Sequence, residues 1–171
     1  MRRRFLYWLT GFLPCRLIKI GDQPYLERYY VGQLFGVTFY LHRFISADGD
    51  RDVHNHPWRL SAALVLVGGY REERVTQITP DGWHSKERDL YLPKINIITG
   101  SRFHRIMETR PETWTLFMHG KRISTSTKAW GFLQKTADGL RLFNPYNLDE
   151  SIGWWKRLPN GNASGREPYA G

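Results

Sequence analysis

The chain has 171 residues, a length that suits one domain with a single core and excludes two large domains. Hydrophobic residues make up 41% and aromatic residues 15%, which excludes a disordered chain and favours a β-rich core. The formal charge of +9 favours anionic partners such as nucleic acid, anionic lipid or anionic metabolites. The single cysteine, Cys15, excludes an internal disulfide or thiolate cluster and favours a reducing cytoplasm.

The chain begins with "MRRRFLYWLTGFLPCR", in which basic residues precede an apolar run. Thr10, Gly11 and Pro14 interrupt this run and no small-residue cleavage site follows, so a signal peptide is disfavoured. We expect residues 1–30 to form an amphipathic segment that docks on the domain or contacts a membrane surface, with docking favoured. Its apolar positions are Phe5, Leu6, Trp8, Leu9 and Phe12.

From Val37 to Leu133 the sequence consists of short apolar segments separated by turn residues. "VTFYLHRFI" is rich in β-branched and aromatic residues, "LSAALVLVGGY" is an apolar run that ends in two glycines, and "TPDGW" is typical of a hairpin turn. This rhythm predicts an all-β sandwich or small barrel. In the first segment, one strand face is expected to carry Tyr40, His42 and Phe44, and the other Phe39, Leu41 and Arg43.

The polar stretch that includes "LPNGNASGREPYAG" has little to bury, so residues 151–171 are expected to form a flexible tail. The β domain itself is expected to span residues 31–150. No internal repeat is visible at a useful period.

The stretch "RDVHNHPW" places His54 and His56 two positions apart, directly before Pro57. A residue that precedes proline is pushed from the α region toward extended backbone. In extended backbone, side chains two positions apart project from one face, so both imidazoles can reach the same ion. A third ligand must come from elsewhere in the chain, and the candidates are His42, His84, His104 and His119.

His104 is the favoured third ligand because, in "INIITGSRFH", it follows an apolar strand and a glycine turn and opens the next strand. A histidine in this position can point into a barrel mouth. His84 is expected to be exposed in a hairpin turn, and His119 lies at a strand end. His42 is expected to be a core histidine, or a group that contacts the metal ligands or a substrate if its strand face lines the interior.

These residues resemble the two motifs of the cupin superfamily, whose small barrels hold a metal with two histidines and a glutamate from the first motif and a histidine from the second. Gly68 matches the glycine that closes the first motif, and Gly100 matches the turn of the second. Ser61 stands where the family has glutamate, so the resemblance implies three neutral histidine ligands. The strict resemblance covers residues 54–108, and the wider pattern is similar to a group of small phage and bacterial cupin-like proteins.

The resemblance implies a single-domain, all-β cupin-type barrel (a double-stranded β-helix) with an N-terminal helical segment. It implies a divalent metal at His54, His56 and His104, with Fe(II) preferred and zinc or nickel as alternatives. Three-histidine cupins include oxygen-activating iron enzymes such as the thiol dioxygenases, so the favoured function is an iron-dependent oxygenase that acts on a small anionic substrate. Weaker candidates for substrate contacts are His42, Arg43, Tyr91, Arg102 and Trp130.

Other functions stay open at this point. One is a non-catalytic ligand-binding or nucleic-acid-associated accessory cupin, and another is a metal-independent sugar isomerase or epimerase with a histidine base. Pairing into a homodimer also stays open.

Two other interpretations of the histidine region are disfavoured. An HNH nuclease needs a helix after the motif, but the residues after Trp58 are apolar and suit a buried strand. "DGDRD" spaces its carboxylates as a calcium loop does, yet Arg59 occupies the position of the final acidic ligand, so a solvated connection is expected.

Overall fold

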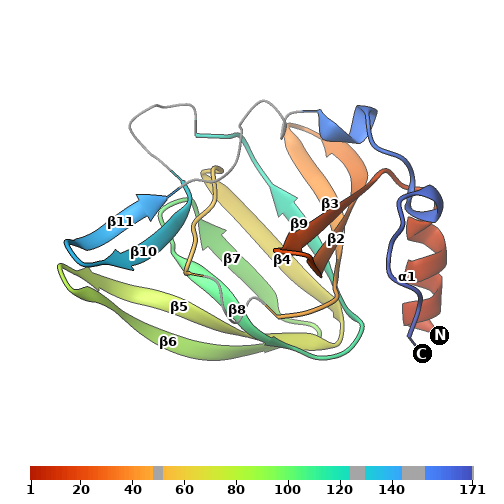
Figure 1. Cartoon of the computed structure of the whole chain (residues 1–171). Helices are drawn as coiled ribbons and strands as arrows, with labels where there is room; N and C mark the ends of the chain where they lie inside the picture. The colour runs from red at the N-terminus through yellow and green to blue at the C-terminus, as the bar shows by residue number, and fades with distance from the viewer. Residues whose placement is uncertain (48–51, 124–129, 144–152, 171) are drawn as a thin grey trace.

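The chain forms antiparallel β-sheets that follow one short helix, α1 (Arg2–Thr10) (Figure 1). The structure is a computed structural model, and it describes residues 1–47, 52–123, 130–143 and 153–170. The calcium-loop interpretation of "DGDRD" falls on residues 48–52, most of which lie outside the described residues. Among the helices of the described chain, none combines the length and the apolar character that a membrane crossing requires.

One layer of the molecule is a six-stranded sheet with the strand order β1-β2-β3-β9-β4-β7. Its strands are β1 (Cys15–Ile20), β2 (Gln23–Leu34), β3 (Val37–Phe44), β4 (Leu60–Val67), β7 (Ile95–Thr99) and β9 (Thr113–His119).

The facing layer contains a three-stranded sheet, in the order β6-β5-β8, and a two-stranded sheet of β10 and β11. Its strands are β5 (Gly69–Thr79), β6 (Gly82–Tyr91), β8 (His104–Thr109), β10 (Phe132–Thr136) and β11 (Gly139–Phe143). Two single-turn 3-10 helices follow, η1 (Trp154–Lys156) and η2 (Gly161–Ala163). The hairpin of β5 and β6 turns at Pro80 and Asp81, as "TPDGW" predicts.

The main core lies between the two layers, because the inward faces of both are apolar. Phe44 of β3 and Tyr70 of β5 contact one another across the layers, with ring centroids 5.8 Å apart. The all-β sandwich predicted from the turn rhythm is therefore the observed architecture. The buried residues of this core are Tyr25, Leu26, Phe44, Val65, Tyr70, Leu90 and Ile106.

Strand β3 shows how the sequence alternation positions the functional residues. Tyr40, His42 and Phe44 line the interior between the layers. Leu41 packs on the opposite face against Trp114, beneath α1, and Arg43 is also buried on that side. The alternation in "VTFYLHRFI" predicts this division, so a histidine enters the interior while an arginine is directed away from it.

Gly68 separates β4 from β5 and allows the chain to pass from one layer to the other. Its φ is +73°, and a Cβ atom there would lie 2.4 Å from Oγ1 of Thr113. Both facts require glycine at this position. The apolar run "LSAALVLVGGY" is therefore a strand that ends at this turn, with β5 beginning on its far side.

Two strands lie in the part of the chain expected to be a docking segment. Strand β1 and most of β2 fall within residues 1–30, so the sheet begins at Cys15 and not at residue 31. The stretch "RLIKIGDQPYLERYY" alternates charged and apolar residues around a Gly-Asp turn. The charged residues in this stretch make its strand pattern hard to recognise from the sequence, although the residues form the β1–β2 hairpin.

Residues 153–170, where the composition predicts a flexible tail, contact the domain at several points. Trp154 is buried and its ring stacks on that of Tyr40, with centroids 5.9 Å apart. The backbone NH of Cys15 donates to the carbonyl of Pro159 at 2.9 Å. Much of this contact uses backbone groups, which a reading of side-chain hydrophobicity does not detect.

Candidate metal centre

His54 and His56 lie on an extended segment between β8 and β10. The backbone NH of His54 donates to the carbonyl of His104, and the NH of His104 donates to the carbonyl of His54, each at 2.9 Å. On the other side, the NH of Asn55 donates to the carbonyl of Gly131 at 3.1 Å. The segment therefore joins the two sheets of its layer, in the extended conformation that the residue pair before Pro57 predicts.

The alternation of this segment directs the two imidazoles to the same side. Val53 and Asn55 are buried, and Val53 belongs to an apolar cluster with Val75. His54 and His56 line the cavity between the layers. The side chain of Asn55 holds the backbone in place, because its Nδ2 donates to the carbonyl of Gly100 at 3.0 Å and its Oδ1 accepts from Gly131 at 2.8 Å.

Gly100 is required by the close approach of the histidine segment. A Cβ atom at this position would lie 2.4 Å from the carbonyl oxygen of Trp58, which is shorter than any stable contact. The glycine turn before His104 therefore admits the chain that carries His56. This steric requirement explains why a glycine is needed in the turn of the second motif.

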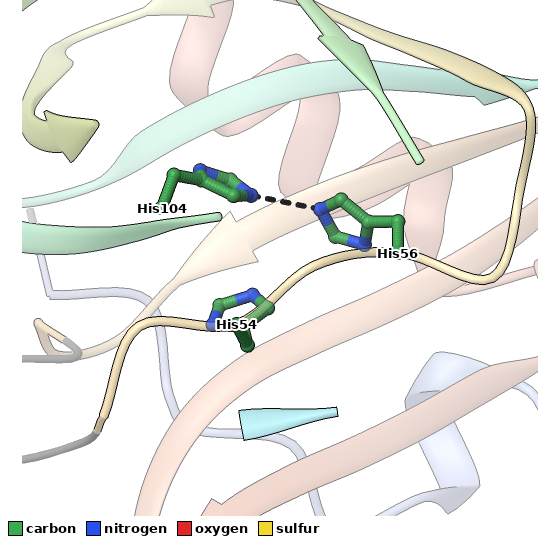
Figure 2. Close-up of side chains that lie close together, drawn as sticks. All are labelled: His54, His56 and His104. Atoms are coloured by element: carbon green, nitrogen blue, oxygen red, sulfur yellow. Dashed lines mark hydrogen bonds between the residues drawn. The ribbon is translucent and has the colours of Figure 1, made fainter. Parts of the chain in front are cut away.

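The imidazoles of His54, His56 and His104 come together in the cavity (Figure 2). One ligand atom from each histidine lies within 4.8 Å of the other two. Nε2 of His56 lies 2.9 Å from Nε2 of His104. Among the described residues, these three are the group of histidine, cysteine and acidic side chains whose geometry suits a metal ion.

Glu72 of β5 determines how His104 presents its ring. A carboxylate oxygen of Glu72 lies 2.7 Å from Nδ1 of His104, so Nδ1 carries a proton and donates to it. In a neutral ring, Nε2 then holds a lone pair, and this atom points at His56 (Figure 2). A carboxylate behind a ligating histidine is the usual arrangement in metal sites, where it fixes the tautomer and raises the basicity of the ligand.

Glu72 is itself held as a buried anion. Its carboxylate accepts from Nδ2 of Asn96 and from Nε of Arg88, both at 2.7 Å, and Nε of Arg74 lies 3.3 Å away. Burial raises the pKa of Glu72, but the hydrogen bonds from His104 and Asn96 and the charge of Arg74 outweigh it and lower the pKa to about 2. The group is therefore ionised at neutral pH.

The pKa of His56 favours the form that binds metals. Burial lowers it well below the usual value, and the neighbouring His104 and Arg28 lower it further. At neutral pH the ring is uncharged and carries a lone pair, which is the state that a metal ion requires. The pKa of His42 is also well below its usual value, because burial and the charge of Arg28 both lower it.

The separations of the three rings fit a single ion. Nitrogen ligands of zinc lie at about 2.0–2.1 Å, so two of them on one ion are at most about 4.2 Å apart. One pair of ligand nitrogens is 2.9 Å apart and no pair is more than 4.8 Å apart, so the three separations are similar to those that one ion requires. Three imidazoles, one of them backed by a carboxylate, form a donor set that suits iron, zinc or nickel.

The three histidines lie in a cavity of about 720 Å³ between the layers. Five of the six histidines line it, and His84, as predicted, is exposed on β6. His119 stacks on Trp58 with ring centroids 4.0 Å apart, and burial lowers its pKa to about 4. Among the described residues that line the cavity there is no Asp or Glu, whereas five are cationic: Arg16, Lys19, Arg28, Lys121 and Arg122.

Arg28 lines this cavity next to His42. Its Nε donates to Nε2 of His42 at 3.0 Å, and its guanidinium lies 5.6 Å from the centre of the Tyr40 ring. Its charge lowers the pKa of His42, His56 and His119, which places it within electrostatic reach of the histidine cluster. The sequence did not single out Arg28, because only the pairing of β2 with β3 places it opposite His42.

The weaker substrate candidates divide into two groups. His42 and Trp130 line the cavity. Arg43, Tyr91 and Arg102 are not among the residues that line this cavity, so the geometry gives no support to a substrate contact from them. Tyr91 packs under Arg110, with the guanidinium 4.0 Å from the ring centre, and Arg102 is exposed, with one guanidinium nitrogen 3.4 Å from the carbonyl of Val75.

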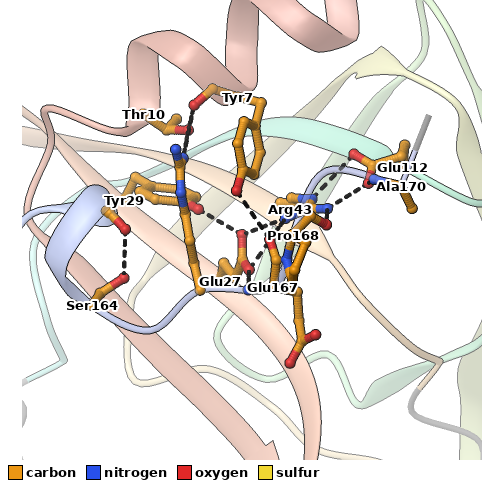
Figure 3. Close-up of polar contacts among 12 residues, drawn as sticks. Tyr7, Thr10, Glu27, Tyr29, Arg43, Glu112, Ser164, Glu167, Pro168 and Ala170 are labelled. Atoms are coloured by element: carbon orange, nitrogen blue, oxygen red, sulfur yellow. Dashed lines mark hydrogen bonds and ion pairs between the residues drawn. The ribbon is translucent and has the colours of Figure 1, made fainter.

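Arg43 is buried on the other side of the main sheet, where it joins the N- and C-terminal parts of the chain (Figure 3). It pairs with Glu27 and Glu112 and donates to the carbonyls of Glu167 and Pro168 at 2.7 and 2.9 Å. Strand alternation directs it away from His42. Its role in the fold is structural.

Two further sequence interpretations can be compared with the geometry. Ser61, at the position expected to hold a glutamate, is buried and lies 3.3 Å from the carbonyl of Ile98, to which its hydroxyl donates. The carboxylate near the cluster is instead Glu72, which contacts the outer nitrogen of His104. The residues after Trp58 form strand β4, so the helix that an HNH nuclease needs is absent from Leu60–Val67.

Comparison with solved structures identifies the fold as that of the cupins. An Fe(II) form of HppE in complex with substrate aligns over 64% of this chain and 57% of its own, with a TM-score of 0.52 and 9% identity. HEPD from Streptomyces albus, with 2-hydroxyethylphosphonate and Fe(II) bound, aligns over 67% and 25%, with a TM-score of 0.51 and 11% identity. A variant of oxalate decarboxylase from B. subtilis aligns over 72% and 31%, with a TM-score of 0.50 and 16% identity.

This chain therefore spans little more than half of HppE and about a third or less of the other two proteins. No family model and no curated protein matches the sequence. At such low identity, the similarity establishes the fold and not the activity.

Proposed function

We propose that the protein is a metal-binding cupin in which His54, His56 and His104 hold Fe(II), and that it acts as an iron-dependent oxygenase on a small anionic substrate. The observation that carries the proposal is the contact between Glu72 and His104. It fixes the ring so that Nε2 faces the other two imidazoles, which a buried core histidine does not need.

The donor set favours a centre with open coordination positions. Three neutral imidazoles on one side of an ion leave the remaining positions to other ligands, and among the described residues no carboxylate joins the cluster. When bound there, ferrous iron would supply a redox-active Lewis acid whose open positions a chelating substrate and O₂ can share. HppE and HEPD, both solved with Fe(II), have the same fold and support the choice of metal.

The cavity supports an anionic substrate. Its described lining has five cationic side chains and no acidic one. Arg28 is the cation best placed to bind a carboxylate or phosphonate near the cluster, because it contacts His42 and influences the pKa of His56. The aromatic wall, which includes Trp58, Phe117 and Trp154, would exclude water around the bound molecule. The phosphonate substrate of HEPD is an anion of the class expected here.

Metal content is the first test. We expect the wild-type protein, purified without a histidine tag, to hold close to one equivalent of metal after anaerobic loading. His104→Ala should lose it, whereas His84→Ala, a change of the same size on the exposed face of β6, should keep it. Equal metal content in the two variants would remove the assignment of the site.

Oxygen consumption tests the chemistry. The iron-loaded protein should consume O₂ in the presence of at least one member of a panel of thiols and small acids, and His104→Ala should not. For the active substrate, Arg28→Gln should raise KM roughly tenfold or more with a smaller effect on kcat. Arg71→Gln, on the solvent-exposed face of β5, serves as the control. Stable metal binding without any turnover would contradict the oxygenase proposal.

The remaining alternatives give different outcomes in the same experiments. Salt-sensitive DNA binding by a folded, metal-free protein would favour an accessory cupin. Sugar isomerisation by the metal-free protein would favour acid-base chemistry at a histidine.

A further inference from the structure

Helix α1 has one face that packs on the domain. Leu6, Tyr7 and Leu9 contact the cluster on the outer side of the main sheet that contains Leu41 and Trp114. Thr10 is fully buried, and its hydroxyl donates to the carbonyl of Leu6 at 2.8 Å. The apolar side chains on this face of α1 pack against the domain, so the helix is an integral part of the fold.

The C-terminal segment fixes the position of α1 (Figure 3). Arg166 donates to the carbonyl of Tyr7 at 2.7 Å and lies 3.1 Å from the hydroxyl of Thr10. Its guanidinium also lies 3.6 Å from the centre of the Tyr7 ring, and the hydroxyl of Tyr7 donates to the carbonyl of Glu167 at 3.3 Å. The orientation of α1 is therefore defined by contacts on its inner side, independently of any partner.

The outer side of α1 and the turn that follows it carry a row of exposed aromatic rings. Phe5, Trp8 and Phe12 are 57%, 59% and 59% exposed. Phe5 and Trp8 are three positions apart on α1. Phe12 lies in the turn that follows the helix, where its backbone NH donates to the carbonyl of Leu9 at 3.2 Å. The rings contact one another, with centroids 6.1 Å apart for Phe5 and Trp8 and 5.3 Å apart for Trp8 and Phe12. Single exposed apolar residues are common in soluble proteins, but a contiguous row of three large rings usually marks an interaction surface.

The charge next to this row is strongly positive. Arg2, Arg3 and Arg4 are exposed at the start of the helix. Residues 1–12, which include all three rings, contain no aspartate or glutamate. A partner for this surface must therefore combine negative charge with an apolar layer into which the rings can insert.

We propose that Phe5, Trp8 and Phe12, together with Arg2–Arg4, form a docking surface for an anionic lipid bilayer. A helix that lies in the membrane interface buries aromatic side chains at the boundary of headgroups and acyl chains and places arginines among the lipid phosphates. Each arginine near an anionic surface adds to the electrostatic attraction between the helix and the membrane. The metal centre faces the interior on the opposite side of the main sheet, so docking through α1 leaves the cavity side free of the membrane contact.

The same features disfavour two other occupants. A second copy of this chain bound through α1 would bring the arginines of both copies together, and the surface offers no acidic group to compensate them. A nucleic acid would be attracted by the arginines, but the three rings contact one another and are not spread apart to stack with separate bases.

Vesicle flotation with the full chain tests the proposal. We expect the protein to float with vesicles of phosphatidylcholine and phosphatidylglycerol at low salt, and much less with vesicles of phosphatidylcholine alone or at high salt. The triple variant Phe5→Ser, Trp8→Ser, Phe12→Ser should partition roughly tenfold or more weakly. Ile97→Ser, which removes an equally exposed apolar side chain from β7, should bind like the wild type.

A second measurement keeps the test decisive if the triple variant fails to fold. Brominated phosphatidylcholine in the same vesicles should quench part of the wild-type tryptophan emission, and the conservative variant Trp8→Phe should abolish that part. Flotation that does not depend on anionic lipid would overturn the proposal. So would ring-dependent binding to a DNA duplex, or ring-dependent dimerisation in solution, in the absence of vesicle binding.

Discussion

A carboxylate oxygen of Glu72 lies 2.7 Å from Nδ1 of His104, although the two residues are 32 positions apart and belong to adjacent strands. This contact connects the fold to the proposed chemistry, because it decides which nitrogen of His104 faces the cluster. The carboxylate of Glu73, the next residue, accepts hydrogen bonds from Trp83, Ser85 and Arg105. Substitutions of Glu72 and Glu73 can therefore be compared to test the role of the Glu72–His104 contact.

We expect Glu72→Gln to weaken metal binding about 10–100-fold, because an amide neither holds the Nδ1 proton as strongly nor raises the basicity of the ring. Glu73→Gln should leave metal affinity within about twofold of the wild type, a change below 0.5 kcal/mol. Competition titration with a chelating dye measures both affinities. Equal affinities in the two variants would show that Glu72 does not orient the ligand.

Gly100→Ala should lower both stability and metal affinity. The added methyl would lie 2.4 Å from the carbonyl oxygen of Trp58, so the segment that carries His56 must move away from His104. A loss of stability of roughly 1–3 kcal/mol is expected, as for overpacked sites in general. Gly120→Ala is the control, because its nearest contact is the carbonyl of Leu60 at 3.9 Å. Thermal unfolding and metal titration of both variants, with no difference between them, would contradict this steric account.

Arg43→Met should destabilise the fold by about 3–5 kcal/mol, because it leaves the carboxylates of Glu27 and Glu112 buried without their counter-ion. The matched change Arg71→Met removes a side chain that is 41% exposed and should cost less than about 1 kcal/mol. Urea denaturation measures both costs. A mild effect of Arg43→Met would mean that the buried network contributes little to attaching the C-terminal segment.

The unfolding free energy should fall as the pH rises from 9 to 11. Burial raises the pKa of Cys15 from its usual 9.0 to about 11. In this window the unfolded chain has lost the thiol proton that the folded chain still holds, so alkali favours unfolding, by an amount on the order of 2 kcal/mol. Burial raises the pKa of Tyr29 as well, and this acts in the same direction.

Cys15→Ser should reduce this alkaline loss without abolishing it, because Tyr29 still contributes. Urea titrations at several pH values would measure the difference between the variant and the wild type. The native thiol should also react slowly with iodoacetamide at pH 8. Rapid alkylation of the folded protein at that pH would contradict the raised pKa.

Local patterns predicted the strand character of residues 37–44 and the hairpin turn at Pro80 and Asp81, because alternation and turn chemistry are properties of neighbouring residues. The same reasoning predicted that His54 and His56 share a face, and the structure brings them next to His104. That these three residues hold a metal stays a prediction.

Contacts between distant strands could not be predicted in this way. Glu72 reaches His104 because of the pairing between β5 and β8, in which the register shifts next to Glu72. Arg28 faces the cavity because β2 pairs with β3. Arg43 lies on the strand that carries His42, and its role became clear only from the backbone carbonyls of the C-terminal segment.

The aromatic lining of the cavity also makes the protein its own optical probe. Four of the seven tryptophans, Trp58, Trp130, Trp154 and Trp155, line the space in which the proposed substrate would bind. A molecule that displaces water there changes the polarity around these indoles at once. Intrinsic fluorescence can therefore be used to screen unlabelled compounds for binding before any turnover assay exists.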